Sequence, residues 1–369
     1  MTSTMASPDP IATLLGQFSE GKKAALARAV SIVENRRAGA DRLLAELHPR
    51  LGRARRIGVT GPPGAGKSTL TTELTAAYRR AGLTVGIVAV DPTSPFTGGA
   101  LLGDRIRMES VALDPGVFIR SMATRGSLGG LAAATRDVTD VLDAFGLDRV
   151  IIETVGVGQT ELDVSRTADS TMVVLVPESG DSIQTLKAGL MEIADIFVVN
   201  KSDRPGADRL RNELELMIGL RSGDTLRNVP AHHGVDLGRA MTKAEKLAMN
   251  PGRAAREAAR AESATWTPPV LRTVAAKAEG TDDVMAALER HAHYLETSGT
   301  LAERRRKRLR DRVVEVVERT LQQRLWQDAG TNEWLMERIP ALESGSTNPF
   351  AVAHELVARS GDLMTGRTR

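Results

Sequence analysis

Short runs of aliphatic and β-branched residues alternate along the middle of the chain with longer segments whose apolar residues recur at helical spacing. Such runs are typical of strands that are buried on both faces of a sheet. Because strands that alternate with helices favour parallel pairing, the pattern predicts an α/β fold with a doubly wound, mainly parallel sheet. The predicted strands are Ile57–Thr60, Val85–Val90, Val117–Arg120, Arg149–Glu153, Thr171–Val176, Ile196–Asn200 and Val270–Ala275, and the predicted helices between them include Lys67–Ala81, Leu131–Phe145, Gln184–Ile193 and Asp208–Ile218.

Helical patterns also occupy both ends of the chain. We expect an N-terminal helical extension over residues 1–51 and an α/β domain over residues 52–298. A stretch at about 221–265, rich in Arg, Ala and Gly, interrupts the alternation and is interpreted as an insertion. Residues 299–369 are expected to be helical, and they begin with a long amphipathic helix whose first turns are strongly basic.

Composition narrows the class of protein without identifying it. The 369 residues are 41% hydrophobic but only 3% aromatic, so the core must be built from Ala, Val, Leu and Ile. A net charge of +3 gives little reason to expect a nucleic-acid partner. The chain has no cysteine, which excludes disulfides, zinc–thiolate sites and thiol nucleophiles. Its N-terminus lacks an apolar signal-peptide core and no run reaches membrane-spanning length, so we expect a cytoplasmic protein without a membrane partner.

A glycine-rich segment follows the first predicted strand and opens the first long helix. It fits the pattern G-x-x-x-x-G-K-[ST], in which backbone N–H groups surround phosphate oxygens at a helix N-terminus. The lysine places a positive charge near the β- and γ-phosphates, and the hydroxyl is a magnesium ligand. A strand before the segment and a helix after it make a chance match a minor alternative. The candidate phosphate-binding residues are Gly61, Pro62, Pro63, Gly64, Ala65, Gly66, Lys67, Ser68 and the following Thr69.

A second motif, Asn200-Lys201-Ser202-Asp203, follows the sixth predicted strand and fits N-K-x-D. The Asp203 carboxylate can accept hydrogen bonds from guanine N1–H and the exocyclic amine, a donor pair that adenine lacks. Asn200 would brace the phosphate loop, and the Lys201 stem would cover one face of the base. Four residues match weakly by themselves, but their order after the phosphate motif favours guanine specificity over a simple turn.

Two acidic residues end predicted strands that we expect to neighbour the phosphate-loop strand. Asp91 follows the second strand and Glu153 follows the fourth, so both are candidate magnesium ligands together with Ser68. Gly156 is placed to donate its N–H to the γ-phosphate. Each acid taken singly could instead cap a turn.

Two further residues lie in Gly-containing stretches that we interpret as switches. Asp104 is a candidate magnesium ligand and catalytic residue, and Lys187 is a candidate catalytic cation for the transition state. For Lys187 a solvated helix face is an equally supported interpretation. The histidines at His232, His233, His291 and His293 are interpreted as surface or packing residues, because no cysteine accompanies them.

Together these motifs resemble the MeaB/ArgK/MMAA GTPases, which belong to the SIMIBI class of P-loop proteins. The resemblance covers residues from about 10 to about 300. Its most specific marks are Gly61–Ser68, Asp91–Gly99 (DPTSPFTGG), Leu102–Arg105 (LGDR), Thr124–Gly130 (TRGSLGG), Glu153–Gln159 (ETVGVGQ) and Met191–Asp195 (MEIAD) leading into Asn200–Asp203.

The resemblance implies a homodimeric GTPase that uses GTP, GDP and Mg²⁺ and acts as a chaperone of an adenosylcobalamin-dependent acyl-CoA mutase, chiefly methylmalonyl-CoA mutase. It implies that GTP hydrolysis is coupled to loading and protection of the mutase, with dimerisation through the C-terminal helical arm over 299–369. It also implies a third switch at about Pro177–Lys187. Ala275 and Ala276 replace the usual Ser-Ala turn and would offer backbone N–H groups to guanine O6. These departures leave open which acyl-CoA mutase is the partner.

Three other functions stay open at this level. A SIMIBI metallochaperone that delivers nickel would need Cys and His ligand clusters, and the lack of cysteine counts against it. A kinase would use the same phosphate loop to transfer the γ-phosphate to an acceptor. A binding scaffold with a degenerate site is disfavoured by the intact Lys67, Ser68, Asp91 and Glu153.

Overall fold

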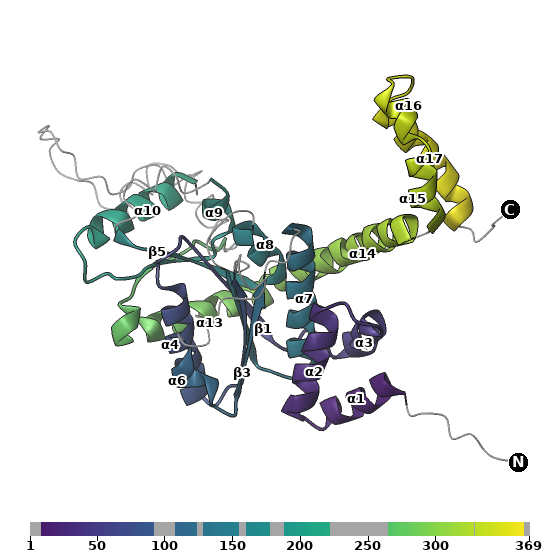
Figure 1. Ribbon diagram of the computed structural model, residues 1–369. Coiled ribbons are helices and arrows are strands. Elements are labelled where there is room, and N and C mark those ends of the chain that lie inside the picture. Colours follow the sequence, from purple (N-terminus) through teal and green to yellow (C-terminus); the bar gives the residue numbers. More distant parts are fainter. Residues whose placement is uncertain are drawn as a thin grey trace, which may run out of the picture. The chain divides into compact units, whose positions relative to one another are not determined.

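All seven predicted strands form one sheet in the computed structural model of the chain (Figure 1). The structure describes residues 9–91, 108–123, 128–154, 160–177, 188–221, 265–327 and 329–364. Every pairing between the described strands is parallel, and the strand order is β3-β2-β4-β1-β5-β6-β7. The strands are β1 (Arg55–Thr60), β2 (Val85–Asp91), β3 (Val117–Ala123), β4 (Arg149–Thr154), β5 (Ser170–Leu175), β6 (Ile196–Val199) and β7 (Val270–Arg272).

The strand order corrects one expectation about the site. Glu153 does end a neighbour of β1, because β4 pairs directly with it. Asp91 does not, because β4 lies between β2 and β1. Strand order follows from the long crossover connections and not from local sequence, so alternation alone could not reveal it.

Alternate residues of the strands enter hydrophobic clusters on the two faces of the sheet. On one face, Val88 and Ile152 pack with α7 (Leu128–Ala144). On the other, Ile87 and Ile151 pack in a cluster with residues of the two helices α4 (Lys67–Arg80) and α13 (Thr281–Thr297). Burial on both faces explains why the strands are continuous apolar runs. The remaining helices of this part are α6 (Glu109–Ala112), α8 (Thr160–Thr167), α9 (Ala188–Ile193) and α10 (Ala207–Arg221).

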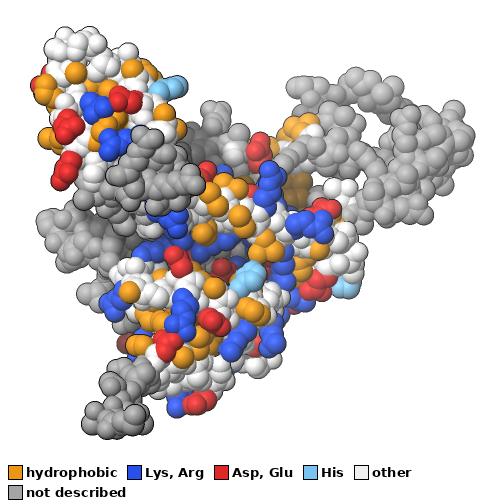
Figure 2. All heavy atoms as spheres, turned by 90° about the vertical axis from the view of Figure 1, so that its right-hand side faces the viewer, with side chains coloured by type: hydrophobic (Ala, Val, Ile, Leu, Met, Phe, Trp, Pro, Cys, Tyr) orange, Lys and Arg blue, Asp and Glu red, His pale blue; other side chains and the backbone are white. Residues whose placement is uncertain are grey.

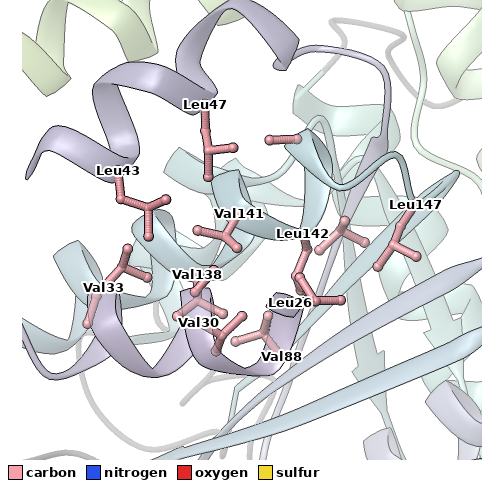
Figure 3. Close-up of a cluster of buried hydrophobic side chains, with 14 of the residues drawn as sticks. Leu26, Val30, Val33, Leu43, Leu47, Val88, Val138, Val141, Leu142 and Leu147 are labelled. Carbon is pink, nitrogen blue, oxygen red and sulfur yellow. The ribbon is translucent and has the colours of Figure 1, made fainter. Parts of the chain in front are cut away.

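The N-terminal helices share a core with the sheet instead of forming a separate layer. They are α1 (Pro10–Ser19), α2 (Lys23–Glu34) and α3 (Ala40–Leu47), followed by the 3₁₀ turn η1 (His48–Arg50). Figure 3 shows side chains of α2 and α3 directed at α7. The side chains that are labelled there from these two helices are at most 1% exposed, so the extension supplies much of the cover of α7: Leu26, Val30, Val33, Leu43 and Leu47.

The chain divides into two compact units, residues 1–301 and 302–369. The second unit holds most of α14 (Thr300–Gln327) together with α15 (Ala329–Met336), α16 (Ile339–Glu343) and α17 (Pro349–Met364). Its small core is built on Trp334, whose ring lies 3.6 Å from the Arg338 guanidinium carbon. Figure 2 shows basic and acidic side chains interspersed with apolar ones. No helix among the described residues combines the length and the apolar character that a bilayer crossing requires.

The last strand is shorter than predicted. The pattern extends it to Ala275, but β7 ends at Arg272, Val274 forms an antiparallel bridge with Glu279, and Ala275 begins the 3₁₀ turn η3 (Ala275–Lys277). Residues 184–187 of the predicted helix Gln184–Ile193 and residues 222–264 of the predicted insertion lie outside the described residues.

A buried carboxylate on α7 fixes the point at which the chain enters β1. Asp143 is fully buried and accepts hydrogen bonds from the N–H groups of Gly52, Arg53 and Ala54 at 2.9–3.0 Å and from Arg56 at 2.7 Å. Arg56 also contacts Asp140 at 2.8 Å. Burial by itself lowers the pKa of Arg56, but the carboxylates of Asp140 and Asp143 outweigh burial and raise that pKa above its ordinary value.

Replacing Asp143 therefore tests the anchor of β1. Asp143→Ala leaves the Arg56 guanidinium with one carboxylate fewer and removes an acceptor from three backbone N–H groups, of which that of Ala54 is buried, so we expect the free energy of unfolding to fall by about 3 kcal/mol. Asp140→Ala is the matched control, because this more exposed carboxylate also contacts Arg56, and its loss should cost about 1 kcal/mol. Urea unfolding followed by circular dichroism measures both. Equal losses would contradict the role given to Asp143.

Candidate functional site

The segment after β1 forms a loop in which two glycines cannot be replaced without a clash. Gly61 has φ of +140° and Gly66 has φ of +85°, in the region that favours glycine. A Cβ atom on Gly61 would lie 2.1 Å from the Val174 carbonyl oxygen, and one on Gly66 would lie 2.3 Å from Asn200 Nδ2. The predicted loop is therefore packed against β5 on one side and against the second motif on the other.

Lys67 begins α4, the fourteen-residue helix that follows the loop, and its side chain is turned back over it. Only 6% of the residue is exposed. Its ammonium donates to the carbonyl oxygens of Gly61 at 2.8 Å and Pro62 at 2.9 Å. A lysine held at the mouth of such a loop, in front of a helix N-terminus, is suited to binding phosphate oxygens.

A hydroxyl and a carboxylate meet beside the loop. Ser68 Oγ donates to Glu153 Oε1 at 2.5 Å, because β4 lies next to β1 with Val59 paired to Glu153. Asp91 ends β2, the strand on the far side of β4, and its backbone reaches the same carboxyl edge of the sheet. The predicted oxygen ligands Ser68 and Glu153 are thus already in contact, and oxygens of this kind fit Mg²⁺.

Asn200 joins the phosphate loop to the motif that follows β6. Its buried amide donates to the Ala65 carbonyl oxygen at 2.8 Å. Its Oδ1 accepts from the Thr273 hydroxyl at 3.1 Å and from the Ala275 N–H at 3.0 Å. The predicted brace is therefore formed, and it also includes the turn after β7.

The rest of the motif forms a tight turn at the surface. Lys201 adopts a φ of +54°, which is unusual outside glycine, and its ammonium donates to the Gly64 carbonyl oxygen at 2.9 Å. Asp203 lies exposed at the end of this turn, where its carboxylate faces Lys277 at 3.6 Å. Lys201 and Asp203 thus lie in one surface turn, with the Lys201 ammonium tied to the phosphate loop.

Arg272 of β7 and Thr273 directly after it hold the turn at Ser202 in place, and neither was predicted from the sequence. The Ser202 N–H donates to the Thr273 carbonyl oxygen at 3.0 Å. The Arg272 guanidinium donates to the Ser202 carbonyl oxygen at 3.1 Å and to Asp208 at 2.7 Å. One indication of these contacts was present in the sequence: the predicted last strand follows the N-K-x-D motif along the chain. The Ala275 N–H, which was predicted to donate to guanine, instead donates to Asn200 Oδ1. Ala276, the other predicted donor, is exposed.

Three predicted site residues, Asp104, Gly156 and Lys187, lie outside the described residues. His291 lies far along the chain from the motifs and packs inside the protein: it is fully buried, with Nδ1 2.7 Å from Ser170 Oγ and Nε2 3.3 Å from Asp195. Ser170 opens β5, so this cluster is at the amino edge of the sheet, opposite the phosphate loop. Within the described ranges, no group of three or more His, Asp or Glu side chains is arranged to hold a metal ion.

The chain is similar to known GTPases over most of its length. The family model described as methylmalonyl Co-A mutase-associated GTPase MeaB matches residues 26–330. A Pyrococcus horikoshii protein is 46% identical over 308 residues, which cover 84% of this chain and 86% of that protein. The GTPase ArgK of Escherichia coli is 42% identical over 197 residues, which cover 52% of this chain and 60% of ArgK.

The fold is also found among solved structures. A crystal structure of a LAO/AO transport system kinase superposes with a TM-score of 0.60 at 24% identity, and the match covers 96% of this chain and 99% of that one. Likeness at this identity concerns the fold, a P-loop NTPase with a parallel sheet. Because the family model spans most of the chain and the phosphate loop and the guanine motif are joined in one site, the chain belongs to the MeaB family and is a P-loop GTPase.

Proposed function

We propose that this GTPase binds GTP with Mg²⁺ and couples its hydrolysis to adenosylcobalamin loading and protection of an acyl-CoA mutase, methylmalonyl-CoA mutase or a relative. The observation that carries the nucleotide part is the Asn200 side chain, which hydrogen-bonds the phosphate loop at Ala65 and the turn after β7 at Ala275. One buried amide thereby holds the phosphate loop beside the turn that carries the proposed base-selecting carboxylate, and a guanine nucleotide needs both.

The chemistry proposed is in-line attack of water on the γ-phosphate. Loop N–H groups and Lys67 supply positive charge to the phosphate oxygens, and most of the rate enhancement comes from positioning and charge neutralisation. Ser68 and Glu153 would hold Mg²⁺, which when bound neutralises charge on the β- and γ-phosphates. Asp91 lies at the same sheet edge and is proposed as the third oxygen ligand, with Asp104 and Lys187 kept as proposed catalytic residues.

The polar groups proposed to bind phosphate and Mg²⁺ are hydrogen-bonded to other groups of the chain. The Lys67 ammonium satisfies two of its donors on Gly61 and Pro62 carbonyl oxygens, and the Ser68 hydroxyl is satisfied by Glu153. The Lys67 ammonium and the Ser68 hydroxyl are thus both hydrogen-bonded within the chain. Binding exchanges neutral carbonyl acceptors for charged phosphate oxygens, which form stronger hydrogen bonds with an ammonium.

The mutase partner and the homodimer are proposed from the family. The matching family model is itself described as mutase-associated. An exposed apolar stripe supports a second copy as the partner of α14, because residues four apart share one side of a helix. The stripe consists of Leu309, Val313, Val317 and Leu321. Pro177 ends the described part of the proposed third switch, and residues 178–187 lie outside it.

Lys67→Ala tests the phosphate cradle. Removing an ammonium that neutralises transition-state charge should lower kcat for GTP hydrolysis by about 100-fold or more. Phosphate release with Mg²⁺ present measures this, and analysis of labelled products separates release from transfer to an acceptor. Lys22→Ala, which removes an exposed lysine paired with Glu20, should hydrolyse GTP at the wild-type rate. Wild-type hydrolysis by Lys67→Ala would refute the role given to the cradle.

Asp203→Asn tests the choice of base. An amide can no longer accept both guanine donors, but it can donate to the carbonyl that xanthine carries in place of the amine. We expect the affinity for GTP to fall by about 100-fold and the affinity for xanthosine triphosphate to rise. Calorimetric titration with GTP, xanthosine triphosphate and ATP gives the three dissociation constants. An unchanged preference for GTP would remove Asp203 from the base site.

The partner is tested by mixing the purified chain with the methylmalonyl-CoA mutase of the same organism. Sedimentation velocity with a nonhydrolysable GTP analogue should show a complex, and the chain alone should sediment as a dimer. GTP, but not the analogue, should increase the amount of adenosylcobalamin bound by mutase supplied without cofactor. Failure of both readouts with GTPase activity intact would reject this mutase and leave the hydrolysis chemistry standing.

A further inference from the structure

The carboxylate that is proposed to receive the guanine base already has a cationic partner. Lys277 Nζ lies 3.6 Å from Asp203 Oδ2, and the two side chains are 58% and 44% exposed. Guanine N1–H and the exocyclic amine would approach the same two carboxylate oxygens. The ammonium and the base therefore need the same acceptor, and the hydrogens of both carry positive charge.

The backbone around this ion pair is fixed. The Lys277 N–H donates to the Val274 carbonyl oxygen at 2.8 Å, and Val274 N donates to the Glu279 carbonyl oxygen at 3.0 Å. The turn that carries Asp203 is tied to the same segment through the Ser202–Thr273 hydrogen bond at 3.0 Å. The two residues are thus presented to each other by a rigid pair of turns.

The Lys277 side chain, in contrast, is free to leave. It is more than half exposed, and a lysine has a flexible four-carbon stem with a strongly hydrated ammonium. Losing the contact moves the ammonium into water without any change in the backbone. Lys201 differs, because its ammonium is held by the Gly64 carbonyl oxygen at 2.9 Å.

We propose that Lys277 is an internal competitor for the guanine base: its ammonium occupies Asp203 in the nucleotide-free protein and is displaced when guanine binds. This inference rests on the proposed function, because it needs the base to bind at Asp203. An ion pair that must be broken weakens guanine affinity, so Lys277 sets how tightly GDP is held and favours its release after hydrolysis. ADP presents no donor pair to the carboxylate and leaves the ion pair in place.

The effect of the Lys277–Asp203 ion pair on GDP affinity has an expected size and depends on salt concentration. Ion pairs between exposed groups change an equilibrium by up to about five-fold. Salt screens such a pair, whereas it acts on the phosphate contacts of GDP and ADP alike. The ratio of the ADP and GDP dissociation constants therefore isolates the competition at the base from every effect at the phosphates.

The test measures both dissociation constants by calorimetric titration for the wild type and Lys277→Met, whose unbranched side chain keeps the length of the stem. At low salt the ADP/GDP ratio of Lys277→Met should be about two- to five-fold higher than that of the wild type, through tighter GDP binding. At about 1 M salt the difference should vanish. Lys277→Arg keeps the charge and should resemble the wild type.

Lys22→Met is the matched control, because Lys22 is paired with Glu20 and is 57% exposed, almost the same as Lys277. It removes the same charge from a similar pair and should leave the ratio unchanged. If Lys277→Met binds GDP equally or more weakly while the wild type binds it normally, the competition is refuted and the proposed function stands. If the wild type binds no GDP, the proposed function fails and this inference fails with it.

Discussion

The buried side chain of Asn200 is the contact on which the arrangement of the site depends. From the end of β6, its amide nitrogen and oxygen reach two segments that lie far away in the sequence: the loop after β1 and the turn after β7. A residue that is 2% exposed must have its polar atoms paired, and these partners pair both of them. The cost of leaving them unpaired keeps the three segments together, and phosphate and base positions follow from that.

The sheet explains why the Asn200 side chain alone can hold these segments of the site together. Parallel strands bring all of their carboxyl ends to one edge, so the ends of β1, β2, β4, β6 and β7 lie along the same side of the sheet. On the opposite edge, the same sheet places Ser170 and His291 in a packed cluster with Asp195. Two sets of polar side chains with superficially similar chemistry therefore have different roles because of the edge on which they lie.

Much of this was readable from the sequence, for a physical reason. Buried parallel strands are continuous apolar runs and phosphate loops need glycine, so the seven strands and Gly61–Ser68 were predictable from local pattern. Strand order, the early end of β7 and the contacts of Asp143 were not, because each depends on partners distant in the chain. Val274 has a strand-forming side chain, yet its N–H bonds to Glu279 in the following turn, whereas the N–H of Thr273 still bonds to Val199 of β6. The contacts of Arg272 with Ser202 and of Lys277 with Asp203 could not be predicted either, because their partners are also distant in the chain.

The tight packing of the phosphate loop also limits how the gene can vary. A glycine codon changed at its first or second base encodes either a residue with a side chain, of which the smallest is alanine, or a stop. At Gly61 the methyl group would overlap the Val174 carbonyl oxygen, and at Gly66 it would overlap the Asn200 amide. Both codons are therefore expected to accept only silent third-base changes, whereas Gly64, which has open space at the Cβ position, pays only for its positive φ.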